Sequence, residues 1–79
     1  MTQFIRYEEV EGEGTLACMA SGDTTLTVIA RLILNLARMT NGEYSAQKIL
    51  KMLEEKYIPE QILKAGSEKR IYEEVIYPD

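Results

Sequence analysis

The feature that most constrains this chain is the apolar stretch over residues 24–40. Residues 21–23, Ser-Gly-Asp, can cap the start of a helix there, and residues 41–42, Asn-Gly, suit a left-handed cap at its end. Projected at about 100° per residue, the polar side chains occupy an arc of roughly 80°, and nearly all the rest is apolar. Because an ordinary surface helix needs an apolar stripe of only about 100°, this helix should be covered on more than one side.

Little else in a chain of 79 residues can cover such a helix. A domain of this size buries only about 60% of its unfolded surface and is near the lower limit for independent folding. Apolar surface left exposed on this scale is typical of an interface, and two-fold homodimers are the commonest assemblies. We therefore expect a homo-oligomer whose interface residues are Leu26, Ile29, Leu32, Ile33 and Leu36. The alternative is that the rest of the chain wraps the helix completely.

The chain is predicted to form a single small α+β domain over residues 1–79. Residues 1–22 contain two runs rich in β-branched and aromatic side chains. The connection between them, residues 11–14, contains two glycines, which indicates a β-hairpin. An isolated hairpin is marginal in water, so we expect it to pack on the long apolar helix.

The helical part of the domain is predicted over residues 23–66. After the long helix, Ser45 can cap a second, amphipathic helix over residues 46–57. The dipeptide at residues 58–59, Ile-Pro, should break that helix, because proline lacks a backbone N–H. A short helix is then expected over residues 60–65.

The C-terminal segment, residues 67–79, fits either a strand or a short helix. Ile71, Tyr72, Val75 and Ile76 have helical spacing, but their β-branched and aromatic content is typical of a strand. We predict a strand, because a third strand would stabilise the hairpin.

Four polar side chains on the long helix are candidates for ligand binding: Thr27, Arg31, Asn35 and Arg38. A guanidinium group can donate two parallel hydrogen bonds to a phosphate or carboxylate, and nearby hydroxyl and amide groups can add donors. In an oligomer, two such stripes could line a pocket for a small anionic ligand. The alternative is a solvent-exposed face on which the arginines pair with glutamates.

Composition excludes most catalytic chemistry. The chain has no histidine and one cysteine, so Ser-His and Cys-His nucleophiles, nearly all catalytic zinc sites and internal disulfides are ruled out. We expect a non-enzymatic cytoplasmic protein without metal or cofactor.

A net charge of −4 argues against direct nucleic-acid binding. No signal peptide is predicted, and the residues from Leu26 to Met39 are too few and too polar at Arg31 to span a membrane.

Three further features favour simple structural roles. Residues 21–25 could cradle an anion at a helix N-terminus, but Asp23 would repel it, so capping is the better interpretation. Four glutamates at positions 8, 9, 11 and 13 fit a solvated strand edge and no calcium loop. Cys18 lies among apolar residues and is expected to be buried and inert.

Residues 10–15, Val-Glu-Gly-Glu-Gly-Thr, and residues 20–22, Ala-Ser-Gly, lead into the long apolar helix. In this first half the chain resembles small phage- or prophage-encoded accessory proteins of Gram-positive bacteria. The resemblance implies a role in countering host defence, by sequestering a nucleotide-like signal or by binding an effector protein. We therefore expect a homo-oligomeric binding protein for a small anionic, nucleotide-like ligand. The alternative is a protein-interaction module, an inhibitor of a host protein or an antitoxin, that docks through its apolar helix.

Overall fold

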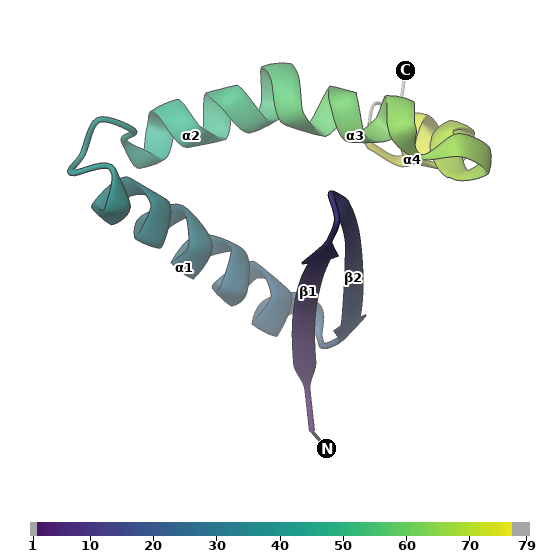
Figure 1. The fold of residues 1–79 in the computed structure, drawn as a ribbon, viewed down its shortest axis with the longest axis horizontal. Coiled ribbons are helices and arrows are strands. Elements are labelled where there is room, and N and C mark those ends of the chain that lie inside the picture. Colours follow the sequence, from purple (N-terminus) through teal and green to yellow (C-terminus); the bar gives the residue numbers. More distant parts are fainter. Residues whose placement is uncertain (1, 77–79) are drawn as a thin grey trace. The chain divides into compact units, whose positions relative to one another are not determined.

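The computed structural model describes residues 2–76 and shows an α+β chain in which a hairpin precedes a series of helices (Figure 1). The chain divides into two compact units, Met1–Leu36 and Ala37–Asp79, called here the first and second units. The elements are β1 (Phe4–Val10), β2 (Glu13–Met19), α1 (Gly22–Met39), α2 (Ala46–Met52), a π-helical turn (Leu53–Tyr57), α3 (Ile58–Lys64), a 3-10 turn (Gly66–Glu68) and α4 (Lys69–Ile76).

The predicted hairpin is confirmed, with a tighter connection than expected. Strands β1 and β2 pair antiparallel from Phe4 opposite Met19 to Val10 opposite Glu13, so only two residues form the loop. Those two, Glu11 and Gly12, have φ values of 52° and 82°. Two-residue hairpin turns of the type that matches strand twist require positive φ at both positions, which explains why a glycine stands here.

One face of the hairpin carries an aromatic ring above a glycine. Tyr7 lies diagonally across the ladder from Gly14, and a Cβ atom built on Gly14 would collide with the Tyr7 hydroxyl and lie 2.7 Å from Cζ. Because Gly14 has no side chain, the Tyr7 ring can lie over it on this face of the sheet. Cys18, on the same face, is exposed, so the prediction of a buried thiol is wrong. The reason is that no other element of the first unit buries this face of the two-stranded sheet.

Helix α1 begins and ends as the sequence predicts. The Ser21 hydroxyl accepts a hydrogen bond from the Thr24 backbone N–H at 3.2 Å, and the Ser21 backbone N–H donates to Gln3 Oε1 at 2.7 Å. At the other end, the Gly42 N–H donates to the Ala37 carbonyl at 2.9 Å. Asn41 and Gly42 have φ values of 53° and 80°, as a left-handed helix cap requires.

The covering that the sequence predicts for this helix is not seen in the single chain. No residue of α1 is buried, and no residue of the described part of the first unit, 2–36, is buried either. Large apolar side chains are exposed on both the hairpin and the helix, among them Tyr7, Leu16, Leu26 and Leu32. The first unit by itself therefore has no hydrophobic core.

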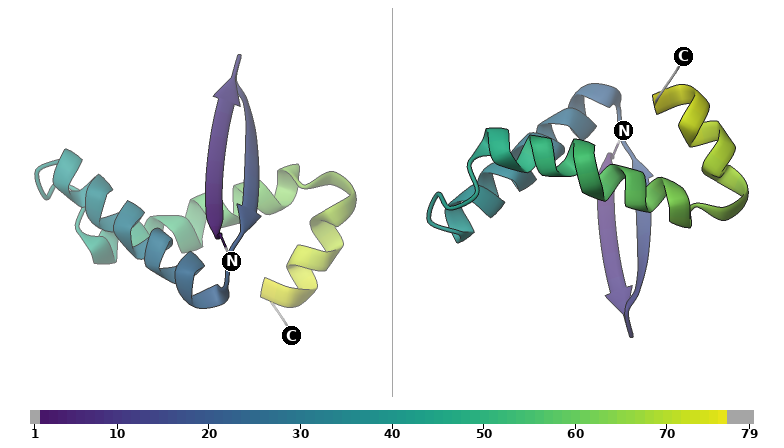
Figure 2. Two further views of the ribbon diagram at one scale, coloured as in Figure 1. Left: turned by 90° about the horizontal axis from the view of Figure 1, so that it is seen from below. Right: turned by 90° about the horizontal axis from the view of Figure 1, so that it is seen from above.

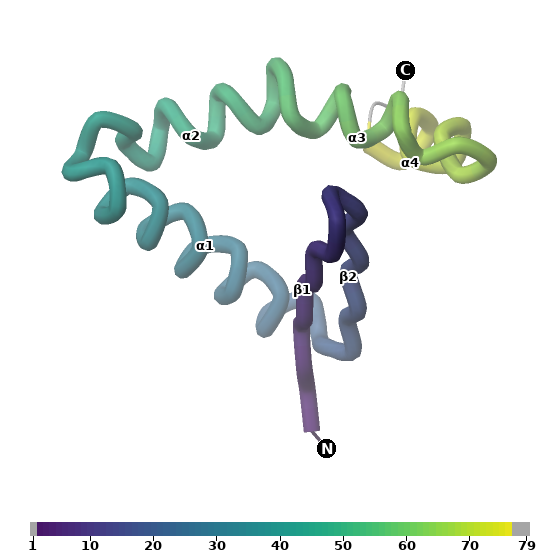
Figure 3. Tube along the Cα trace, in the orientation of Figure 1, coloured from purple at the N-terminus to yellow at the C-terminus, as the bar shows by residue number. Residues whose placement is uncertain are grey.

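In the second unit, α2, the π-helical turn and α3 follow one another as one continuous rod (Figures 2 and 3). Ser45 caps α2 as predicted, its hydroxyl accepting from the Lys48 N–H at 3.2 Å. The predicted break at residues 58–59 is wrong, because the Ile58 N–H bonds to the Leu53 carbonyl in a π turn. This wider turn precedes Pro59 and lets the rod continue past a residue that has no N–H and would crowd an α-helical turn.

The predicted C-terminal strand is also wrong: residues 69–76 form helix α4. Two exposed ion pairs between residues four apart support this helix, with Arg70 Nε 3.0 Å from Glu74 Oε1 and Lys69 Nζ 3.7 Å from Glu73 Oε1. Such pairs suit a helix, on which residues four apart are neighbours. Residues 77–79 of the predicted segment lie outside the described residues.

Glu68 and Tyr72 add a third contact at this spacing, which has a consequence at high pH. The Tyr72 hydroxyl donates to Glu68 Oε2 at 3.0 Å, and this hydrogen bond and the carboxylate charge raise the pKa of Tyr72 above 10.0. Because the folded pKa is raised, the contact stabilises the fold fully below pH 10, and the benefit is lost as the pH rises through the folded pKa. Glu68→Gln should therefore lower the pKa of Tyr72, measured by its tyrosinate absorbance against a Tyr72→Phe blank. An unchanged titration would contradict this account.

Two apolar side chains of the second unit are buried. Ile49 in α2 and Ile62 in α3 are only 4% and 6% exposed. Ile49 belongs to the apolar face predicted for the second helix, on which Ala46 and Leu53 are half-buried and Leu50 is exposed. Helix α4 packs against α3, which carries Ile62.

Candidate functional site

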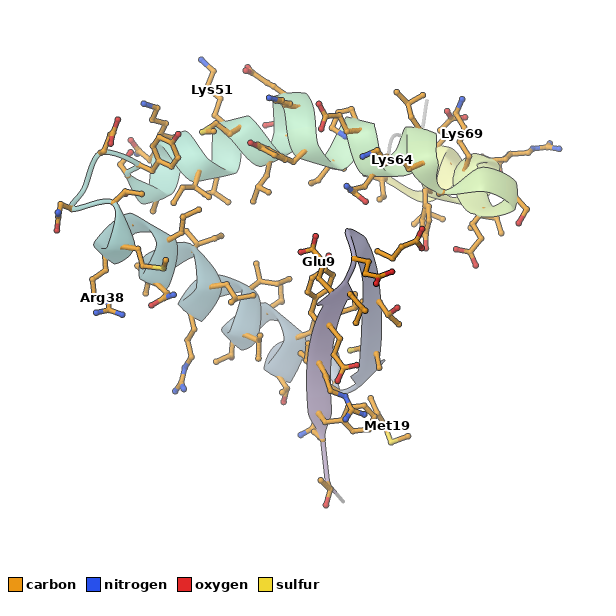
Figure 4. The ribbon with its side chains drawn as sticks, viewed as in Figure 1. Glu9, Met19, Arg38, Lys51, Lys64 and Lys69 are labelled. Atoms are coloured by element: carbon orange, nitrogen blue, oxygen red, sulfur yellow. The ribbon has the colours of Figure 1, made fainter. Side chains whose placement is uncertain are left out.

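The candidate ligand residues Thr27, Arg31, Asn35 and Arg38 all lie on α1, as predicted. Helical spacing places them within an arc of roughly 80°. The first three belong to the first unit, while Arg38 belongs to the second and projects from the last turn of α1 (Figure 4). An arginine in that turn also interacts favourably with the negative end of the helix dipole.

A shallow depression of about 340 Å³ lies on the first half of α1 and includes part of this stripe. Its lining residues are Asp23, Thr24, Thr27, Val28 and Arg31. Sequence reasoning chose Thr27 and Arg31 as ligand residues, assigned Asp23 and Thr24 to capping and missed Val28. The signal for all of them is helical spacing, because positions three and four apart share a face. Asn35 and Arg38 do not line this depression.

The chemistry of the depression is mixed. Arg31 is exposed and can donate several hydrogen bonds to an anion. The Thr27 hydroxyl donates its one hydrogen bond to the Asp23 backbone carbonyl at 2.9 Å. Towards a ligand, the Thr27 hydroxyl oxygen can therefore only accept a hydrogen bond. The Asp23 carboxylate stands in the same depression and disfavours a second negative charge. Arg31 is therefore the main group here that could hold an anion.

The predicted interface residues lie on the other side of α1. Leu26, Ile29, Leu32, Ile33 and Leu36 span an arc of roughly 120° whose centre lies nearly opposite the polar stripe. Leu26 and Leu32 are 65% and 62% exposed, Ile29 and Leu36 are also exposed, and Ile33 is half-buried. The helix thus presents a continuous apolar strip on one side and a guanidinium-bearing stripe on the other.

The described residues hold no cluster of three or more His, Cys, Asp or Glu side chains that could bind a metal ion. Between residues 2 and 76, none of the helices has both the length and the apolar character needed to cross a membrane.

Comparison of the chain with protein-family models, curated proteins and solved structures finds no match. The candidate site is therefore interpreted from the residues of this chain alone.

Proposed function

We propose that this chain is a non-enzymatic binding protein that works as a homo-oligomer and assembles through the apolar strip of α1. The observation that carries the proposal is the absence of any buried residue in the described part of the first unit, 2–36. A segment of this size without disulfide or metal needs a partner surface to fold stably. A second copy supplies one through the same strip, as isologous two-fold interfaces do.

Assembly of this kind makes folding depend on protein concentration. If each copy completes the core of the other, dilution should lower the thermal unfolding midpoint, because unfolding and dissociation are linked by mass action. We expect the midpoint, followed by helical circular dichroism, to fall steadily as the protein is diluted about a hundredfold. A midpoint that does not change with concentration would favour a chain that covers α1 itself.

Within this assembly, the polar stripe is proposed to bind a small anionic, nucleotide-like ligand, the role that the resemblance to phage accessory proteins implies. The specific support is the exposed Arg31 in the depression on α1, which is the main group there that could hold an anion. Because the apolar strip lies nearly opposite the polar stripe, two-fold assembly through that strip leaves both stripes facing outward, and each copy would bind its own ligand.

The ligand proposal predicts that Arg31→Ala combined with Arg38→Ala abolishes ATP binding in isothermal titration calorimetry. Loss of two charge-assisted contacts should weaken binding at least about a hundredfold. Arg70→Ala is the matched control, because Arg70 is an exposed arginine on α4 that pairs with Glu74. ATP binding that survives in the double variant, or an absence of ATP binding by the unmodified chain, would count against this part of the proposal.

A further inference from the structure

The hairpin has free backbone edges on both sides. Strands β1 and β2 form a sheet of two strands, so each strand is paired along one edge only among the described residues. A two-stranded sheet is marginally stable in water, and three or more strands with an apolar face are usually needed. The hairpin is thus a candidate for strand addition.

The register shows which groups the free edge of β1 offers. In a two-residue turn the flanking residues, here Val10 and Glu13, bond to each other across the loop. Because the direction of backbone groups alternates along an antiparallel strand, Ile5, Tyr7 and Glu9 direct their N–H and C=O groups to the free edge. The outer edge of β1 is therefore able to bind another strand at alternate positions.

We propose that β1 pairs antiparallel with β1 of a second copy of this chain, centred on Tyr7, to form a four-stranded sheet. This inference rests on the homo-oligomer proposed above and adds a second contact surface to it. In this register the two Tyr7 residues face each other and Ile5 faces Glu9, which gives about six backbone hydrogen bonds across the two-fold axis. Phe4 faces Val10, so an apolar pair closes each end.

Charge complementarity favours this register. It places Arg6 of each copy directly opposite Glu8 of the other, and the two-fold axis makes this pair twice. Within the hairpin, Arg6 stands opposite Ala17 and Glu8 opposite Thr15, so neither faces a charged residue on β2. The Arg6 guanidinium carbon lies 5.9 Å from the centre of the Phe4 ring. This contact holds the Arg6 side chain on the face of β1 that also carries Phe4 and Glu8.

The free edge of β2 offers no such match. Its residues from Thr15 to Met19 carry no charge. If β2 paired with β2 of a second copy, these residues would form no ion pairs, and no single register would be favoured. The two edges therefore differ in specificity: β1 is the edge whose sequence complements itself.

The test is charge reversal with dimer dissociation measured by analytical ultracentrifugation. Glu8→Arg places two arginines opposite each other at two symmetric sites, and it should raise the dissociation constant by at least about tenfold. Arg6→Glu should do the same, while the double variant Arg6→Glu with Glu8→Arg restores opposite charges and should restore the affinity. Glu9→Arg is the matched control: it makes the same charge change on the opposite face of β1, where Glu9 is near the turn (Figure 4) and faces Ile5 in the proposed pairing.

The outcomes separate this inference from the proposed function. An oligomer whose affinity is unchanged by Glu8→Arg, or equally weakened by Glu9→Arg, overturns the β1 pairing but leaves assembly through α1 standing. A monomeric unmodified chain overturns both. If the single variants lose the hairpin signal in circular dichroism, the double variant decides: a folded oligomer supports the pairing, and a folded monomer overturns it.

Discussion

Leu32→Lys should dissociate the oligomer and unfold much of the first unit. Leu32 lies midway along the length of the apolar strip on α1 and is 62% exposed in the single chain. In a two-fold interface the substitution acts twice, removing about 2 kcal/mol of apolar burial per copy and placing an unpaired charge in the interface. We expect the dissociation constant to rise by at least about a hundredfold, measured by sedimentation equilibrium.

Thr27→Lys is the control for this variant. It introduces the same side chain on the same helix but within the polar stripe, four residues after Asp23, where a helical ion pair can form. Thr27→Lys should therefore leave the oligomer intact. If both variants dissociate the oligomer equally, or neither does, the interface does not lie on the apolar strip.

Ile62→Ala should strongly destabilise the second unit. Ile62 is 6% exposed, and with Ile49 it is one of the two buried apolar side chains among residues 2–76. Truncating a buried isoleucine removes apolar contacts and leaves a cavity, which costs about 2–4 kcal/mol of unfolding free energy. Urea denaturation at a fixed protein concentration measures this loss.

The neighbouring Leu63→Ala is the matched control, because Leu63 is 67% exposed on the same helix. We expect it to change the unfolding free energy by less than about 1 kcal/mol. If Leu63→Ala costs as much as Ile62→Ala, the second unit buries a different face of α3 in solution.

The helix ends and the hairpin could be predicted from the sequence, because each depends on residues that are close together in the chain. Ser21, Ser45 and the Asn41-Gly42 pair mark helix ends because they satisfy backbone groups within a few residues of themselves. The two runs with β-branched and aromatic content and the glycine-containing connection between them indicate the hairpin in the same way. These features need no information from distant parts of the chain.

The predictions failed where two local signals competed. In the C-terminal segment, β-branched and aromatic content outweighed the helical spacing of the apolar side chains, whereas the segment forms α4, with ion pairs at positions 69 and 73 and at 70 and 74. At Pro59 the missing N–H predicted a break, but a π turn accommodates the ring. The sequence contains no simple marker for that adjustment, because π turns have no strong residue preference of their own.

The candidate site could be predicted only in part. Helical spacing identified the stripe that contains Arg31 and could also have placed Asp23 beside it, but it could not show that the Thr27 hydroxyl donates its proton within the helix. That hydrogen bond depends on the side-chain rotamer rather than on residue type. Helical spacing places the five apolar residues on one side of the helix, but their role as an interface stays a prediction, because local pattern does not encode a partner surface.

The oligomeric state of the unmodified protein can be read from its mass in native mass spectrometry at micromolar concentration. The chain has a mass of 9.0 kDa, so a homo-oligomer should give peaks at a whole multiple of that value, with the dimer as the first expectation. A folded species at 9.0 kDa, with its helical circular dichroism retained at the same concentration, would contradict the account.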